Sequence, residues 1–269
     1  MDKTKIGEKI LESYKSREGI FKEVDRFETS EEIKKSEFYL DYITFVSAID
    51  YQKNIDADKL WEAGEKWAKD YPWLFKPAEL LNKQTSEIAN TFKQITDYKF
   101  FKPQDVYIWL LIADALYKHG GNTKTLLEEF EYDAYKIYTT LSGNLKKDFP
   151  FLSGPKILPM WLRILKEDAG IELKNMEKIP LPVDKNVARV TCNLIFGEKF
   201  DGKVEEIKEK VRKEWNDIAK ELGLPVIKFD YPLWFLGSKG CSKRKCGYCS
   251  FRDDCKSDNA ILPRQSQYL

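Results

Sequence analysis

Apolar residues recur along most of the chain at intervals of three and four, the spacing of amphipathic helices. The clearest run lies in 203–222, where Lys and Glu separate the apolar positions Val204, Ile207, Val211, Trp215, Ile218 and Leu222. Gly223 follows, where a glycine commonly ends a helix. Alternating runs typical of strands are few, so the pattern predicts an all-α fold.

Local signals predict where several other helices begin and end. Thr29 and Glu32 have the spacing of a capping box, and Asp56 is a candidate N-cap for the helix that contains Trp61. Pro103 suits the first turn of an apolar helix that the glycines at 120–121 would stop. We expect one helical lobe over residues 40–165 and a second formed by 1–39 and 166–269, with a cysteine loop at 239–256.

Composition supports a folded protein whose charges are balanced. Hydrophobic residues make up 42% of the 269 residues, and 45 Lys+Arg against 44 Asp+Glu give a formal net charge of +1. This balance excludes a generally basic coat protein for nucleic acid but leaves room for a local basic groove. The N-terminus has no apolar signal core and no long apolar run occurs, so we expect a soluble, intracellular protein with no membrane association. We also expect a monomer that is associated with the nucleoid.

Four of the five cysteines fall in one short loop with the spacing C-x4-C-x2-C-x5-C: Cys241, Cys246, Cys249 and Cys255. In a chain without an export signal, such a cluster indicates metal binding more than disulfides. A [4Fe–4S] cluster is the favoured interpretation. Zinc is the alternative, although structural zinc sites usually combine two separated C-x2-C pairs. Cys192 lies in an apolar helix and is expected in the core.

The cysteine loop is also basic. Residues 239–256 contain two aspartates, Asp253 and Asp254, against six cations: Lys239, Lys243, Arg244, Lys245, Arg252 and Lys256. The balance of +4 fits either a solvated loop that a metal merely holds together or a rigid surface that faces phosphates. Composition alone leaves both interpretations open.

Two helix starts carry candidate catalytic groups. Ser153 is a candidate cap and Pro155 a first-turn residue, so Lys156 would lie near a helix N-terminus, where the helix dipole and apolar neighbours favour a neutral, nucleophilic amine. A surface lysine whose stem covers apolar area is the simpler alternative. Asp184, after Pro180 and Pro182, is expected to cap another helix, and capping alone would explain it.

These motifs in this order resemble the helix-hairpin-helix DNA glycosylases of the endonuclease III superfamily. The resemblance covers roughly residues 150–255 and rests on Gly154-Pro-Lys156, on Pro182-Val-Asp184-x-x-Val-Ala-Arg189-Val and on the cysteine loop. The second motif and Leu233-Trp234 are similar to the archaeal 8-oxoguanine glycosylase branch, and the cysteine loop is similar to endonuclease III.

The chain departs from that family in three places. Only Gly154 remains of the usual hairpin motif Leu-Pro-Gly-Val-Gly, and the first cysteine spacing is four residues instead of six. The interval of 28 residues from Lys156 to Asp184 is longer than in endonuclease III. These departures affect the hairpin backbone that would capture a phosphate or cation, and the geometry of a cluster.

The resemblance implies a two-lobed fold with a C-terminal iron–sulfur loop, bound to double-stranded DNA with a damaged nucleotide flipped out. It implies a bifunctional glycosylase and abasic-site lyase for an oxidised base, either 8-oxoguanine or an oxidised pyrimidine. Lys156 would attack C1′ and Asp184 would accept its proton. Trp234 and Trp61 would line the base pocket. The expected DNA contacts are Gln52, Ser153, Gly154, Lys243, Arg244, Lys245 and Arg252.

Other functions fit parts of the same pattern. The main alternative is a non-catalytic iron–sulfur protein of this fold that binds damaged DNA. An iron–sulfur nuclease using carboxylate-bound metal is less favoured, because no compact Asp…Glu-x-Lys pattern accompanies the cysteines. A zinc-stapled interaction module is the remaining alternative. The one histidine, His119, is assigned no role.

Overall fold

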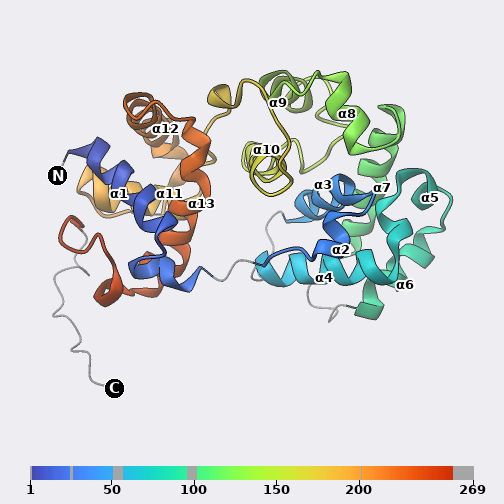
Figure 1. Cartoon of the computed structure of the whole chain (residues 1–269), viewed down its shortest axis with the longest axis horizontal. Coiled ribbons are helices and arrows are strands. Elements are labelled where there is room, and N and C mark those ends of the chain that lie inside the picture. The colour runs from blue at the N-terminus through green and yellow to red at the C-terminus, as the bar shows by residue number, and fades with distance from the viewer. Residues whose placement is uncertain (1, 25–26, 51–56, 96–101, 201, 257–269) are drawn as a thin grey trace. The chain divides into compact units, whose positions relative to one another are not determined.

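The computed structural model describes residues 2–24, 27–50, 57–95, 102–200 and 202–256, and helices make up most of them (Figure 1). Within these residues there is no strand, only one isolated bridge between Asp133 and Lys174. The all-α prediction is confirmed. In the same ranges, no helix is both long and apolar enough to cross a membrane.

The chain divides into two compact units, one of Arg26–Met176 and one that combines Met1–Asp25 with Glu177–Leu269. These bounds differ from the lobes expected at 40–165. The N–H of Ser30 donates to Glu65 Oε2 at 3.0 Å, which places the segment before residue 40 in the first of these units. At the other end, the N–H of Lys174 donates to the carbonyl of Tyr132 at 2.9 Å.

The unit Arg26–Met176 is built around one buried helix. Its helices are α2 (Glu31–Lys34), α3 (Tyr39–Ile49), α4 (Ala57–Asp70), α5 (Pro77–Leu81), α6 (Thr85–Ile95), α7 (Pro103–Lys118), α8 (Thr123–Glu129), α9 (Ala134–Ser142) and α10 (Ile157–Glu167). Helix α3 is buried from Asp41 to Ile49 and contacts α4, α7, α8 and α10. Trp109 stacks on Phe45 with ring centroids 4.9 Å apart and donates to the carbonyl of Leu74 at 2.7 Å.

The predicted helix ends in this unit are partly confirmed. Helix α7 begins at Pro103 and ends just before Gly120, whose φ of +93° suits glycine. The start of α2 was misplaced, because its N-cap is Ser30 rather than Thr29 and no side chain caps it. Asp56 lies outside the described residues, and the helix it was expected to cap begins at Ala57.

A buried polar network joins α3 to α8 and α10. Asp41 Oδ1 accepts the N–H of Thr123 at 2.6 Å, and the Thr123 hydroxyl contacts the Thr44 hydroxyl at 2.9 Å. Trp161 Nε1 donates to the same Thr44 oxygen at 3.0 Å. Burial raises the pKa of Asp41 to about 6, although its hydrogen bonds with Thr123 act in the opposite direction.

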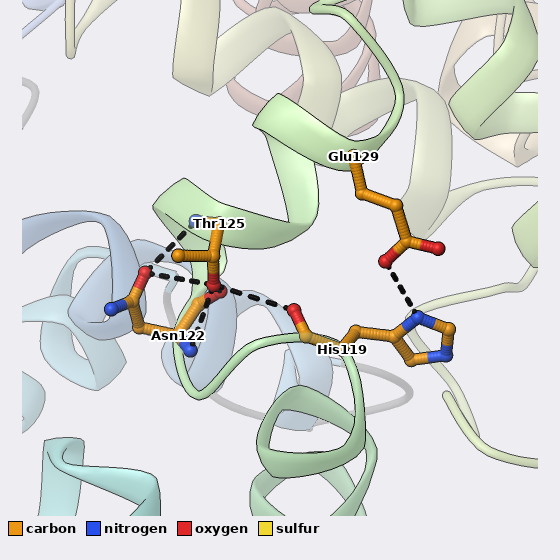
Figure 2. A network of polar contacts seen from close by, with 4 residues as sticks. All are labelled: His119, Asn122, Thr125 and Glu129. Atoms are coloured by element: carbon orange, nitrogen blue, oxygen red, sulfur yellow. Dashed lines mark hydrogen bonds and ion pairs between the residues drawn. The ribbon is translucent and has the colours of Figure 1, made fainter.

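The turn from α7 to α8 is held by the four residues in Figure 2. His119 Nδ1 lies 2.9 Å from Glu129 Oε2, and Asn122 and Thr125 form a reciprocal capping box at the start of α8. Thr125 Oγ1 also donates to the carbonyl of His119 at 3.3 Å. These contacts give His119 a structural place in the turn.

The second unit is closed by the N-terminal segment of the chain. It contains α1 (Lys3–Lys15), α11 (Lys185–Thr191), α12 (Val204–Glu221) and α13 (Asp230–Phe235). In Figure 1 the blue α1 lies beside the orange α12 and α13, which it contacts. A Cβ added at Gly7 would lie 2.6 Å from Ile218 Cγ2, so α1 and α12 pack closely. Helix α12 and the stop at Gly223, whose φ is +65°, are as predicted.

Asp41 makes the stability of its unit depend on pH in a defined direction. The folded-state pKa of about 6 exceeds the ordinary aspartate value of 3.8, so this carboxyl favours folding below pH 4 and loses that contribution as pH rises through 6. We expect the unfolding free energy of the wild type, relative to Asp41→Asn, to fall by up to about 3 kcal/mol between pH 4 and pH 7.5. Urea titrations at both pH values measure the difference.

The control for this prediction is Asp114→Asn, since Asp114 is half exposed and pairs with Lys118 on the surface of α7. That variant should follow the wild type at both pH values. If Asp41→Asn also follows the wild type at both, the buried carboxyl does not titrate as described.

Candidate functional site

Lys156 stands at the start of α10, as the sequence predicted. It is the N-cap residue, with φ −103° and ψ −49°, and its side chain is exposed. Because the lysine is exposed, the expected desolvation of its amine by apolar neighbours is wrong. Two of those neighbours, Leu152 and Trp161, are instead fully buried in the core. The amphipathic helix thus turns its apolar face inward and leaves the lysine at the surface.

The segment 143–156 between α9 and α10 uses its backbone donors internally. The N–H of Ser153 donates to the carbonyl of Phe149, and that of Gly154 donates to the carbonyl of Phe151, both at 3.0 Å. Ser153 is buried, and its hydroxyl donates to the carbonyl of Lys146 at 3.2 Å. The predicted Ser153 cap is therefore wrong. DNA contact at Ser153 and Gly154 stays a prediction that this turn does not favour.

Asp184 caps α11 as predicted. Its Oδ1 accepts the N–H groups of Asn186 at 2.8 Å and Val187 at 3.0 Å, which satisfies two of the donors that a helix start leaves unpaired. The carboxylate is half-buried, and these bonds fix its orientation. Asp184 belongs to the unit that combines Met1–Asp25 with Glu177–Leu269, and Lys156 belongs to the unit Arg26–Met176.

The four clustered cysteines line one cavity of about 350 Å³ in the second unit. Its remaining lining is Arg189, Asn193, Lys199, Phe200, Gly240, Ser242, Arg244, Lys245 and Arg252. Among His, Cys, Asp and Glu, only cysteine occurs in this lining, and five of the other residues are cations. Four thiolates around a di-positive centre keep a net negative charge, which these cations would balance. The donor set therefore fits a metal–thiolate group.

The thiols surround the cavity without meeting at one point. In the part of the chain that the structure describes, no three His, Cys, Asp or Glu side chains are placed to hold a metal ion. None of the five cysteines in this part is joined in a disulfide. Cys192 is buried at the end of α11, as expected of a core residue.

Burial disfavours the ionisation of two of the thiols. It raises the pKa of Cys241 to about 12 and that of Cys249 to about 11. Neighbouring cysteines act in the same direction, whereas Arg189 and a hydrogen bond from the side chain of Asn193 lower the pKa of Cys241. A metal must therefore displace protons to bind here.

Arg189 and Asn193 were not identified as cavity residues from the sequence. They come from α11 and from the π-helical turn Cys192–Phe196 that continues it. Arg189 donates to the carbonyl of Gly237 at 3.4 Å, in a second π-helical turn, Leu236–Gly240, that leads into the cysteines. Such π-turns often occur at functional sites. A contact between residues 48 positions apart, however, cannot be recognised from the local sequence around either of them.

The N-terminal segment braces the cysteine loop from outside the cavity. Lys9 pairs with Asp254 at 2.9 Å, and Glu23 pairs with Lys245. Gly19, at φ +57°, lies so close to Ser250 that a Cβ would collide with its hydroxyl. These contacts fix the loop's backbone on both sides of Cys249.

The four basic residues predicted to contact DNA all lie on the cysteine loop, but only three of them line the cavity. Arg244, Lys245 and Arg252 do so, whereas Lys243 is exposed outside it.

The two tryptophans predicted to line the base pocket are both half-buried. Trp234 stacks on Tyr231 with centroids 5.8 Å apart, and Trp61 packs edge-on against a tyrosine of α3. Gln52 lies outside the described residues.

Residues 156–253 match the model of a family, AGOG, described as N-glycosylase/DNA lyase. The match spans roughly a third of the chain, from the lysine at the start of α10 into the cysteine loop. No curated protein matches the chain significantly. The match supports a helix-hairpin-helix DNA glycosylase that acts in DNA repair, and it implies DNA as the substrate. This agrees with the resemblance inferred from the sequence motifs.

Because the π-turn Leu236–Gly240 lies close to α11, we expect substitutions at two glycines, Gly237 and Gly247, to differ in their effect on stability. A Cβ at Gly237 would lie 2.5 Å from the carbonyl oxygen of Asn186, whereas one at Gly247 meets nothing within 4 Å. We expect Gly237→Ala to lower the unfolding free energy by about 1–3 kcal/mol and Gly247→Ala to change it little. Urea denaturation of both variants checks this. Equal unfolding free energies for the two variants would show that the π-turn can shift to accept the methyl group without loss of stability.

Proposed function

We propose that this protein is a bifunctional DNA glycosylase and abasic-site lyase that excises an oxidised base through a lysine Schiff base. One observation carries the proposal: a single matched segment, 156–253, contains Lys156, Asp184 and the first three cysteines of the loop. The geometry supports it, because both candidate catalytic residues stand at helix starts.

In the proposed reaction, Lys156 supplies the attacking amine. To attack, this amine must give up a proton, and Asp184 is the proposed acceptor. The nitrogen then bonds to C1′ of the flipped nucleotide while the N-glycosidic bond breaks and its electron pair leaves with the base. Ring opening gives an imine. β-Elimination then removes a proton from C2′ and expels the 3′ phosphate, which cuts the strand.

We propose a [4Fe–4S] cluster as the group held by the cysteine cavity. The four cysteines and the cations that line one cavity support this proposal. The presence of a single C-x2-C pair favours an iron–sulfur core over one zinc ion. When bound, such a cluster supplies a rigid anchor for the loop. Cys241, Cys246, Cys249 and Cys255 would hold it, and Asn193 would donate to the first of them.

The basic side chains of the loop are the proposed phosphate contacts. Lys243 and Arg244 are exposed, and Arg244 sits in the left-handed region with φ +55°, which turns the chain sharply after the first cysteine. Lys245 and Arg252 are half-buried at the cavity. Fixed cations on a braced loop position a duplex through its backbone without reading its sequence.

The lyase chemistry predicts a covalent intermediate that borohydride traps. On duplexes containing 8-oxoguanine, an oxidised pyrimidine or an abasic site, we expect the wild type to trap at least one substrate and Lys156→Ala to trap none. Asp184→Asn should trap about 100-fold more slowly or worse, because the proton acceptor is lost. Denaturing gels that resolve the adduct measure both.

The matched control is Lys166→Ala, at the opposite end of α10, where the side chain pairs with Glu172 at the surface. It should trap like the wild type. Wild-type protein that binds damaged duplexes but traps none would favour the non-catalytic DNA-binding alternative.

The cofactor proposal predicts iron and acid-labile sulfide in protein purified without oxygen, about four of each per chain. Cys246→Ser should lose both, because one of four ligands is removed, whereas Cys192→Ala should keep them. Metal analysis and a sulfide assay give the answer. One zinc per chain and no sulfide would contradict the cluster proposal and indicate a structural zinc site.

A further inference from the structure

The cysteine loop presents one large aromatic side chain to solvent. Tyr248 lies between Cys246 and Cys249 and is 69% exposed, more than any other large apolar side chain in the described chain. The other exposed tyrosines, at 107, 117 and 135, lie in the other unit. A tyrosine at this place serves neither the core nor the cavity, whose lining does not include it.

The backbone that carries Tyr248 is held firmly. Its N–H donates to the carbonyl of Lys245 at 3.3 Å, and the N–H of Cys249 donates to the carbonyl of Cys246 at 3.3 Å. On the other side its carbonyl oxygen packs against Gly19, where an added Cβ would come within 2.8 Å. A ring on so constrained a backbone has two side-chain torsions left to order, so binding through it loses little entropy.

The loop that carries the ring is cationic. Exposed Lys243 and Arg244 precede it, and the net charge over residues 239–256 is +4 before any cluster is counted. Cations that follow a phosphate backbone next to an aromatic ring are the combination that binds single-stranded nucleic acid, because every base offers a face for stacking. A phosphate offers the tyrosine ring nothing to stack on. In an intact duplex the faces of the bases are covered by their neighbours, so the ring could not reach them.

We propose that Tyr248 stacks on a base that lies outside the double helix, so that the cysteine loop binds an unpaired nucleotide as well as the phosphates beside it. This inference rests on the proposed function, since it takes DNA to be the ligand. It deepens that function, because glycosylase and lyase chemistry leaves DNA with an unpaired base opposite the damaged position.

The test compares Tyr248→Ala, Tyr248→Leu, Tyr248→Phe and Tyr248→Trp on three fluorescent DNAs: an intact duplex, a duplex with one bulged base and a single strand. We expect the Ala and Leu variants to bind the bulged and single-stranded DNAs about 5- to 100-fold more weakly, and the intact duplex nearly as well as the wild type. The Phe and Trp variants should retain binding, because they keep a stacking face.

Salt dependence separates stacking from charge. Plots of affinity against salt should keep the wild-type slope in Tyr248→Ala, whereas Arg244→Ala should lower the slope by about one. Tyr107→Ala is the control for removing an exposed tyrosine, at 63% exposure, and should bind all three DNAs like the wild type. Iron and sulfide content and helical circular dichroism confirm that each variant is folded.

Two results would overturn the inference: unchanged binding of all three DNAs by Tyr248→Ala, or full binding by Tyr248→Leu, which keeps apolar bulk without an aromatic face. The first would leave Tyr248 available to a protein partner. Either result leaves the proposed function intact when the wild type still forms the borohydride adduct. Failure of the wild type to trap or to bind DNA would refute the proposed function itself.

Discussion

The close packing of α1 against α12 is the constraint on which the second unit depends. There is no room for even a methyl group between Gly7 and Ile218, so the first helix is held directly against the longest one. From that position the N-terminal segment reaches the cysteine loop through Lys9, Gly19 and Glu23. Without this packing, the loop would lose the contacts that Lys9, Gly19 and Glu23 make with its outer side.

The cavity and its cations form one electrostatic arrangement. Buried thiols resist ionisation, as the raised pKa values of Cys241 and Cys249 show. Arg189 of α11 and Asn193 of the π-turn that follows it lower the pKa of Cys241. The basic loop adds further positive charge around the cavity. The residues that would stabilise a metal–thiolate group thus also include the proposed phosphate contacts Arg244, Lys245 and Arg252, so the proposed cofactor and the proposed DNA contact would draw on the same side chains.

Local features were predicted well from the sequence. Periodicity located α12, Pro103 marked the start of α7, and the proline-rich approach marked Asp184 as a cap, because each signal acts within a few residues of where it is read. The cap expected at Ser153 failed for a different reason: its hydroxyl is taken by the carbonyl of Lys146 in the same turn.

Features that depend on long-range packing were not predicted. The exposure of Lys156 follows from which face of α10 turns inward, and the unit boundaries follow from contacts such as Ser30 with Glu65. Arg189 and Asn193 became recognisable as cavity residues when α11 was placed beside the loop, 48 and more positions away. No periodicity or spacing in one sequence reports such neighbours.

The order of the two units along the chain has a consequence for biosynthesis. The unit Arg26–Met176 is continuous and emerges whole from the ribosome, whereas the other needs both α1 and the last helices before its core can close. Domains generally fold as they emerge, so α1 must wait, with its apolar face uncovered, while the continuous unit forms. The cysteine loop is translated after the continuous unit, so the proposed cofactor would be inserted once that unit has already been made.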